Sequence, residues 1–401
     1  MLGHQDHELA AMARLREQVL AVAQSHADAV DREGRFPTET FAALKAARLL
    51  GVMIPQQFGG EGLSIKQVAD LCAALGQVCA SSALIYAMHH IKTSSLVFHG
   101  PGSVWHEAFM SRVASEQLLL GSATTEGGIG GDLRNSLCAV ERDQSGTAFV
   151  LRKEAIVVSY GEQADAILVT ARKDASAPSS DQVLVVGERA QTELVKTGGW
   201  DAFGMRGTGS DGFVLTIKAP VEQIFPLPFA DIAAQSMLAH THILWSAVWY
   251  GIAAEAVQRS QALVRAESRR RAAAALPGHS ITPGNTRLAE LLKELQLMRG
   301  LILSGIERLE QAHTDPSLLE SAGFLIEMNT LKISASEAVV AILNRAMLVC
   351  GIHGYRNDTP YSLGRLMRDA QSAPIMINND RILANTANMV LMNRVSKQLS
   401  G

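Results

Sequence analysis

The sequence predicts an α+β protein that is mostly helical, with an N-terminal helical domain, a middle antiparallel β-domain and a C-terminal four-helix bundle. Apolar residues recur at helical spacing through most of the first 116 residues. Residues 117–226 hold short β-rich stretches without intervening helices, which favours a largely antiparallel sheet. After Pro228 long amphipathic stretches run to the end of the chain, and a four-helix bundle is the natural way to bury them.

The composition is that of an ordinary globular protein. The chain has 401 residues, of which 47% are hydrophobic and 19% charged, with a formal net charge of −3. This balance gives no basic field for nucleic acid or an anionic membrane. We find no apolar signal region and no membrane span of about 18 residues. None of the four cysteines forms a C-x-x-C pair, so we expect reduced thiols and a cytoplasmic location.

The N-terminal domain is predicted to span residues 1–116. Helical spacing predicts helices over Glu8–Val30, from Phe36-Pro37 to Gly51, over Ser64–Gly76 and over Ser81–Gly100. A glycine-dense loop, Ile54–Gly62, separates the second and third of these helices.

The middle domain is predicted to span residues 117–226. The expected strands are Leu118–Thr124, Cys138–Arg142, Ala148–Arg152, Ala166–Ala171, Val183–Val186 and Gly212–Ile217. The second and third of these strands form a hairpin that turns at Asp143–Gly146.

The C-terminal domain is predicted to span residues 227–401. Its expected helices are Ile232–Ala275, Arg287–Ala312, Ser317–Cys350 and Asn379–Leu399, with a breaking loop over Leu276–Gly284.

The common catalytic motifs are missing. The chain has no P-loop, H-E-x-x-H or G-x-S-x-G motif, and Thr124–Asp132 lacks the G-x-G-x-x-G spacing. Glycines in this segment leave backbone amides free to approach an anionic or flat aromatic ligand, although a flexible loop has the same composition. His240 and His242 lie two residues apart on a helix and do not share a face, so we predict no metal site.

Four segments, taken in order, resemble the acyl-CoA dehydrogenase family over nearly the whole chain. Phe36-Pro37 to Gly59-Gly60-Glu61-Gly62 resembles its N-terminal signature, and Thr125–Asp132 its Thr-Glu-Pro-x-x-Gly-Ser-Asp motif. Gly204–Ser210 is similar to its Gly-x-Arg-x-Ser segment. Gly351–Tyr355 and Gly364–Ala370 resemble the Gly-Gly-x-Gly-Tyr and Arg-x-x-Arg-Asp-Ala ending.

The resemblance implies FAD bound between the β-domain and the bundle, across a subunit interface of a homodimer or homotetramer. By matched position, the flavin contacts are Ser122, Thr125 and Ser159, with Val157 at the family's Trp position. Arg269, or else Arg265, is expected at the pyrophosphate of a neighbour's FAD, together with Gly351 and Ile352. The resemblance also places Gly131, His240, Met376 and Ile377 at the substrate.

The family's catalytic glutamate is missing. Its usual position is occupied by Ile377, and the alternative position on the bundle helix falls in Ala239–Ile243, which holds no carboxylate. Asp380 is the nearest acid and the candidate base for removing the α-proton, and His240 or His242 could face the flavin.

Three functions stay open. The first is oxidation of the α,β C–C bond of an acyl-CoA or acyl-carrier-protein thioester, with an unidentified electron acceptor. The second is a flavin-dependent monooxygenase of the same fold, supplied by a flavin reductase, which needs no such base. The third is a non-catalytic homologue that binds flavin or acyl groups.

Overall fold

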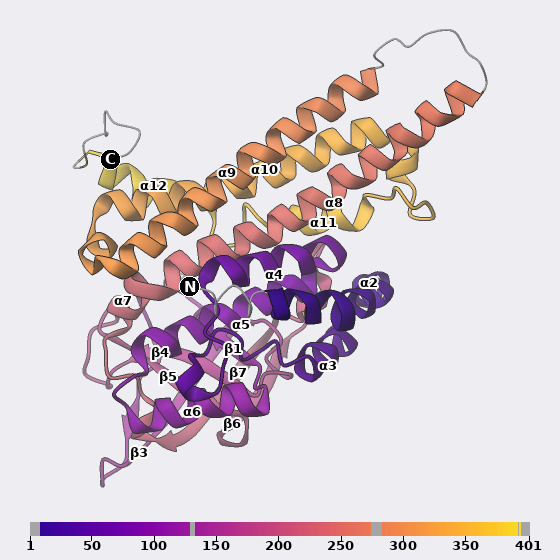
Figure 1. The fold of residues 1–401 in the computed structure, drawn as a ribbon. Coiled ribbons are helices and arrows are strands. Elements are labelled where there is room, and N and C mark those ends of the chain that lie inside the picture. The colour runs from indigo at the N-terminus through magenta and orange to yellow at the C-terminus, as the bar shows by residue number, and fades with distance from the viewer. Residues whose placement is uncertain (1–8, 129–132, 274–282, 392, 394–401) are drawn as a thin grey trace. The chain divides into compact units, whose positions relative to one another are not determined.

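The computed structural model describes residues 9–128, 133–273, 283–391 and 393, which form two compact units. The first unit holds the described residues up to Cys72 together with Ser81–Ala202 and Arg206–Leu244. The second holds Ala73–Ala80, Phe203–Met205 and the described residues from Trp245 onward. The predicted fold class, with helices at both ends of the chain and strands in the middle, is confirmed (Figure 1). The domain boundaries near 116 and 226 stay predictions.

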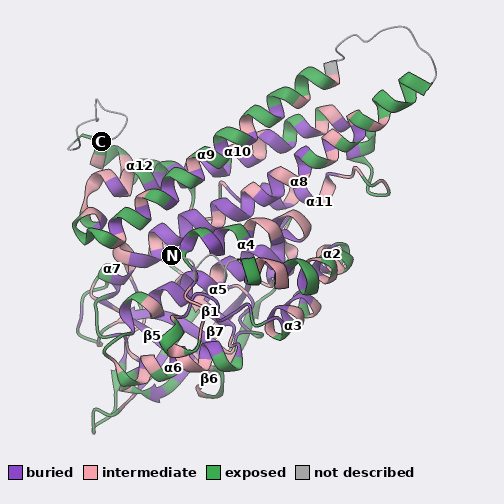
Figure 2. Ribbon diagram, in the orientation of Figure 1, coloured by how far each residue is buried: buried purple, intermediate pink, exposed green. Residues whose placement is uncertain are grey.

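The N-terminal region is helical, and its first three elements pack against one another. The elements are η1 (Leu15–Leu20), α2 (Ala21–Glu33), α3 (Thr38–Ala46), α4 (Ile65–Val78), α5 (Ala80–His99) and α6 (Val104–Glu116). The first predicted helix contains a π-helical stretch, η1, before α2. Helix α6 was not predicted, although its buried residues recur at helical spacing. Figure 2 shows α5 buried along nearly its whole length.

The strands form two sheets. One has the order β1 (Leu120–Ala123), β4 (Ala166–Arg172), β5 (Gln182–Glu188). The other has the order β2 (Glu141–Arg142), β3 (Ala148–Val158), β7 (Asp211–Pro220), β6 (Thr192–Gly198). The predicted hairpin is present, with β2 antiparallel to β3.

Two features of the sheets were not predicted. Strand β1 pairs with β4 in parallel, with Ser122 opposite Leu168, while the other paired strands run antiparallel. Strand β6 escaped prediction because most of its residues are exposed, so the alternation of apolar and polar residues is weak there.

Long helices build the second unit. They are α8 (Leu238–Ala273, from Trp245 in this unit), α9 (Pro283–Thr314), α10 (Ala322–Tyr355), α11 (Gly364–Ala370) and α12 (Asn379–Val390). Helix α9 begins four residues before the predicted start at Arg287, and the short α11 was not predicted. Helices α9 and α10 lie side by side along their lengths (Figure 1), and α10 also packs against α12.

Several predictions fall partly on residues that the structure does not describe. Most of the loop predicted over 276–284 and the end of the last predicted helix, residues 392 and 394–399, lie outside the described residues.

The four cysteines, Cys72, Cys79, Cys138 and Cys350, are free thiols. Helix α10 is the one described helix that is long and apolar enough to cross a membrane.

Candidate functional site

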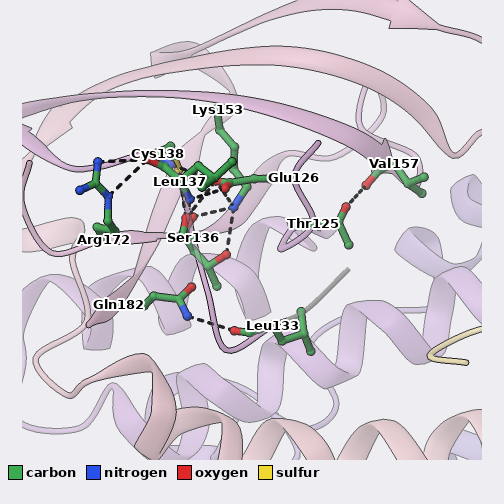
Figure 3. Close-up of polar contacts among 11 residues, drawn as sticks. Thr125, Glu126, Leu133, Ser136, Leu137, Cys138, Lys153, Val157, Arg172 and Gln182 are labelled. Atoms are coloured by element: carbon green, nitrogen blue, oxygen red, sulfur yellow. Dashed lines mark hydrogen bonds and ion pairs between the residues drawn. The ribbon is translucent and has the colours of Figure 1, made fainter. Parts of the chain in front are cut away.

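The loop after β1 is anchored by a buried ion pair. Glu126 and Lys153 are 3% and 0% exposed, and their Oε1 and Nζ atoms lie 3.0 Å apart. Glu126 Oε1 also accepts a hydrogen bond of 2.9 Å from the Ser136 hydroxyl, and the Leu137 amide donates to Oε2 (Figure 3). The motif glutamate therefore links the loop after β1 to Ser136 and Leu137, and it is a structural group.

Lys153 extends this anchor to a second sheet. Its Nζ donates to the Thr170 carbonyl oxygen at 2.7 Å and to the Thr170 hydroxyl at 3.0 Å, which joins β3 to β4. Burial alone would raise the pKa of Glu126, but the charge of Lys153 and hydrogen bonds from Cys138, Leu137 and Lys153 lower it to about 2. The carboxylate is consequently ionised and is not poised to exchange protons near neutral pH.

Two of the predicted flavin contacts lie close together at the end of β3. The Thr125 hydroxyl donates to the Val157 carbonyl oxygen at 3.3 Å (Figure 3). Two residues further on, the Ser159 hydroxyl lies 2.9 Å from that of Ser210. Ser122 lies on β1, only three residues before Thr125, and all three predicted residues are partly exposed.

A strained turn follows Ser159. Tyr160 has a φ of 44°, in the left-handed region that bulky residues rarely adopt. Its hydroxyl donates to the Leu120 carbonyl oxygen at 2.9 Å, and its amide donates to the Thr208 carbonyl oxygen at 2.8 Å. These bonds tie the end of β3 both to β1 and to the segment after the Gly-x-Arg motif. Strain held by surrounding structure is typical of functional sites.

The composition of this edge suits a flavin. Ile156 and Val157 are 51% and 41% exposed, so they present an aliphatic surface beside the hydroxyls of Thr125 and Ser159. A flat ring with polar edges needs an apolar face and nearby hydrogen-bonding groups. Val157 thus offers an aliphatic surface where the resemblance places the family's Trp.

The predicted contacts to a neighbour's cofactor lie in the second unit. Arg269 and Arg265 are exposed on α8. Gly351 interrupts α10 with φ 52° and ψ −135°, a backbone conformation open to glycine, and Ile352 after it is 64% exposed. The structure thus explains why glycine is needed at position 351.

Two of the resembling motifs meet in the second unit. The Asp369 carboxylate accepts a hydrogen bond of 2.7 Å from the Met205 amide. A Cβ on Gly204 would lie 2.1 Å from the Arg368 carbonyl oxygen, so only glycine fits there. The Gly-x-Arg and Arg-Asp-Ala segments lie more than 150 residues apart in the sequence, and their contact supports the resemblance of both to the family motifs.

The segment that carries the family's usual glutamate position is held by a buried lysine. Lys332 on α10 is 0% exposed, and its Nζ donates to the Ile377 carbonyl oxygen and to Asn379 Oδ1, both at 2.7 Å. Ile377 itself has a φ of 47°, which is strained for a β-branched residue. Burial lowers the pKa of Lys332 to about 8, against the opposing effect of Glu337.

The other predicted substrate and catalytic residues are found in different surroundings. Met376 is partly exposed beside Ile377, and Asp380 is exposed in the first turn of α12, where its amide donates to Asn378 Oδ1 at 2.7 Å. His240 belongs to the first unit and is 1% exposed, with Nδ1 2.8 Å from the Ser236 carbonyl oxygen. Gly131 lies outside the described residues.

The buried lysines Lys153 and Lys332 were not predicted as functional or structural groups. Each nevertheless lies at a position where the periodicity of its strand or helix predicts burial. On β3, Lys153 lies two residues from Leu151 and two from Ala155, which are both buried. Because every second side chain of a strand lies on the same face, Lys153 belongs to the buried face. On α10, Lys332 lies four residues after the buried Met328, on the apolar side of the helix. A lysine on an apolar face predicts a specific partner.

Comparison with known proteins matches both ends of the chain to family models. Residues 5–117 match the model described as "Acyl-CoA dehydrogenase, N-terminal domain", and residues 232–392 match "Acyl-CoA dehydrogenase, C-terminal domain". Cyclohex-1-ene-1-carbonyl-CoA dehydrogenase of Syntrophus aciditrophicus is 24% identical over 356 residues, which cover 88% of this chain and 82% of the relative.

Solved structures share the fold at lower identity. KijD3, solved in complex with dTDP, superposes with a TM-score of 0.80 at 20% identity and covers 96% of this chain and 97% of its own. Another structure of KijD3 contains FMN and an amino-keto sugar nucleotide. FMN-bound TdsC from Paenibacillus sp. A11-2, called a dibenzothiophene monooxygenase, gives a TM-score of 0.78 at 19% identity with 98% of each chain covered.

Proposed function

Because the chain belongs to the acyl-CoA dehydrogenase family, we propose that it is a flavin-dependent oxidoreductase whose reaction is the oxygenation of a small organic substrate. The observation that carries this choice is the environment of Ile377. Dehydrogenation of a thioester needs a base at the α-carbon, and a positioned base contributes roughly 10²–10⁴ in rate. Here the position is an isoleucine whose carbonyl oxygen is bound by Lys332.

The alternative position for the catalytic base, on the bundle helix, also lacks a carboxylate. Residues 239–243 hold two histidines and a threonine but no acid. His240 is buried, and its Nδ1 is engaged by a backbone carbonyl oxygen 2.8 Å away. Oxygenation does not require removal of an α-proton, so it is the reaction that fits the residues present at both positions.

The flavin is expected at the end of β3, against Ile156 and Val157, with the hydroxyls of Thr125 and Ser159 at its edge. Arg269, Gly351 and Ile352 are proposed to serve the cofactor of a neighbouring subunit, in a homodimer or homotetramer. Flavin held there in its reduced state would supply two electrons for the activation of O₂. With two protons, one oxygen atom would go to the substrate and the other to water, and a separate reductase would replenish the electrons.

Dehydrogenation of an acyl-CoA or acyl-carrier-protein thioester is the second candidate. It is favoured by the similarity to the Syntrophus aciditrophicus dehydrogenase along 88% of this chain. In that case Asp380 is the nearest acid to Ile377 in the sequence, and the base would come from the exposed first turn of α12.

One set of measurements separates the two reactions. The purified protein is titrated with FAD and with FMN, and binding is followed by flavin fluorescence. The loaded protein is then mixed anaerobically with acyl-CoA thioesters, and separately its chemically reduced form is mixed with ¹⁸O₂ and candidate substrates. We expect no bleaching by thioesters and ¹⁸O in an organic product. Bleaching by a thioester that is abolished in Asp380→Asn would instead establish dehydrogenation.

A further inference from the structure

Helix α5 carries a buried lysine that lacks a counter-ion. Lys92 is 8% exposed, and the one contact of its Nζ within hydrogen-bonding range among the described residues is the Met237 sulfur, 4.0 Å away. A thioether is a weak acceptor and carries no charge. The two other buried lysines in the described part of the chain, Lys153 and Lys332, each donate at least two hydrogen bonds to oxygen.

This isolation is unfavourable for folding. A charged group out of water costs free energy unless it is paired, and no carboxylate of the described chain lies within ion-pair distance of Lys92. Burial lowers the pKa of Lys92 to about 8, so most of the amine is still protonated at neutral pH. A group retained at such a cost points to a role in binding or catalysis rather than in stability.

A second polar group on the same face of α5 also lacks a partner. Lys92, Ser95 and His99 are spaced by three and four residues, which puts them on one side of the helix. The Ser95 hydroxyl is buried and has no hydrogen-bond partner among the described residues. The His99 Nε2 lies 2.9 Å from the Ser236 hydroxyl, and burial lowers the pKa of His99 to about 4, so its ring is neutral.

The element packed against this face is itself unusual. Ser236 and Met237 belong to η6 (Ala233–Met237), a π-helical stretch that leads into α8. Such stretches are rare and occur frequently at functional sites. His240, one turn further on, donates to the Ser236 carbonyl oxygen and packs its ring 5.4 Å from that of Phe98, which is 42% exposed. The cluster is therefore buried but lies next to the protein surface.

We propose that Lys92 and Ser95 bind a single oxyanion of an organic ligand, a carboxylate or a phenolate. The Lys92 ammonium provides the charge and the Ser95 hydroxyl provides a second donor. The neutral His99, already paired with Ser236, borders the site without adding charge. One cation and one hydroxyl match one monoanionic oxygen, whereas phosphate groups are bound by several cations or backbone amides. The binding site is independent of the cofactor; its use in orienting a substrate rests on the proposed function.

The test compares Lys92→Met with a matched control, Lys66→Met, which removes an exposed lysine from α4. Binding of benzoate, 4-nitrophenolate and inorganic phosphate is measured by calorimetry on the full-length protein, with and without flavin. The phenolate is also followed by its absorption band, because a nearby cation favours the ionised form. A preference for benzoate or for 4-nitrophenolate identifies the oxyanion as carboxylate or phenolate.

We expect wild type and Lys66→Met to bind an organic anion equally, and Lys92→Met to bind it at least about tenfold more weakly. Ser95→Ala is expected to weaken binding roughly two- to tenfold, the range of one hydrogen bond. Lys92→Met is also expected to melt at a higher temperature than wild type, because it removes an unpaired buried charge. A lower melting temperature for this variant would assign Lys92 a structural role.

Three other results would overturn the proposal: no binding of either organic anion to the wild type, equal binding to Lys92→Met, or a preference for phosphate. Because anion binding is also measured without flavin, failure of the protein to bind FAD or FMN would reject the proposed function and leave this test intact.

Discussion

The carboxylate of Glu126 and the ammonium of Lys153 form an ion pair of 3.0 Å, and both side chains are almost completely buried. Glu126 follows β1, Lys153 lies on β3, and Lys153 also donates to Thr170 on β4. The pair consequently links both sheets to the loop after β1, which carries Thr125. Glu126 is therefore a structural anchor of this loop.

Glu126→Gln is expected to lower the free energy of unfolding by about 3–5 kcal/mol, because it leaves Lys153 charged, buried and unpaired. Urea unfolding measures the difference. Glu154→Gln, an exposed position on the same strand, is the control and should change stability by less than about 0.5 kcal/mol. If the two variants are equally stable, the ion pair does not anchor the loop.

The same pair predicts a dependence on acid. The folded pKa of Glu126 is about 2, below its ordinary value of 4.5, so its contribution is fully present above pH 4.5 and is lost as the pH falls from 4.5 towards 2. The contribution is about 3 kcal/mol. The difference in melting temperature between wild type and Glu126→Gln should therefore shrink as the pH falls through this range. A difference that stays constant contradicts the assignment.

Lys332→Met is expected to destabilise the protein by about 2–4 kcal/mol, because the carbonyl oxygen of Ile377 and Asn379 Oδ1 lose their donor. Segment 373–379 should become sensitive to limited proteolysis, with cleavage mapped by mass spectrometry. Lys293→Met, at an exposed lysine of α9, serves as the control and should leave the digestion pattern unchanged. Resistance of segment 373–379 in Lys332→Met would show that other contacts hold it.

Ile377→Glu restores a carboxylate at the family's usual position. If the missing base is what prevents dehydrogenation, anaerobic reduction of the flavin by acyl-CoA should become roughly 10²–10⁴ times faster in this variant. Stopped-flow absorbance follows the bleaching. Ile375→Glu places the same charge at a position that is 70% exposed and should have no effect. A silent Ile377→Glu would mean that the substrate is not a thioester.

Prediction from the sequence succeeded where a pattern is local. The periods of 3.6 and 2 located most helices and strands, including the hairpin at Asp143–Gly146, because each pattern lies within a single element. It missed α6 and the short α11, and it missed β6, whose local signal is weak because most of its residues are exposed. The parallel pairing of β1 with β4 joins residues more than 40 positions apart, and nothing local encodes it.

The sequence by itself determined the order of the elements and the resemblance to the acyl-CoA dehydrogenase family. It also determined the absence of a carboxylate at position 377 and at 239–243. Only the tertiary structure decided what the lysines do. Lys92, Lys153 and Lys332 are each charged residues on an apolar face, but their partners come from distant parts of the chain. Folding gives Lys153 a carboxylate and Lys332 two carbonyl oxygens and an amide oxygen, and it leaves Lys92 beside a thioether.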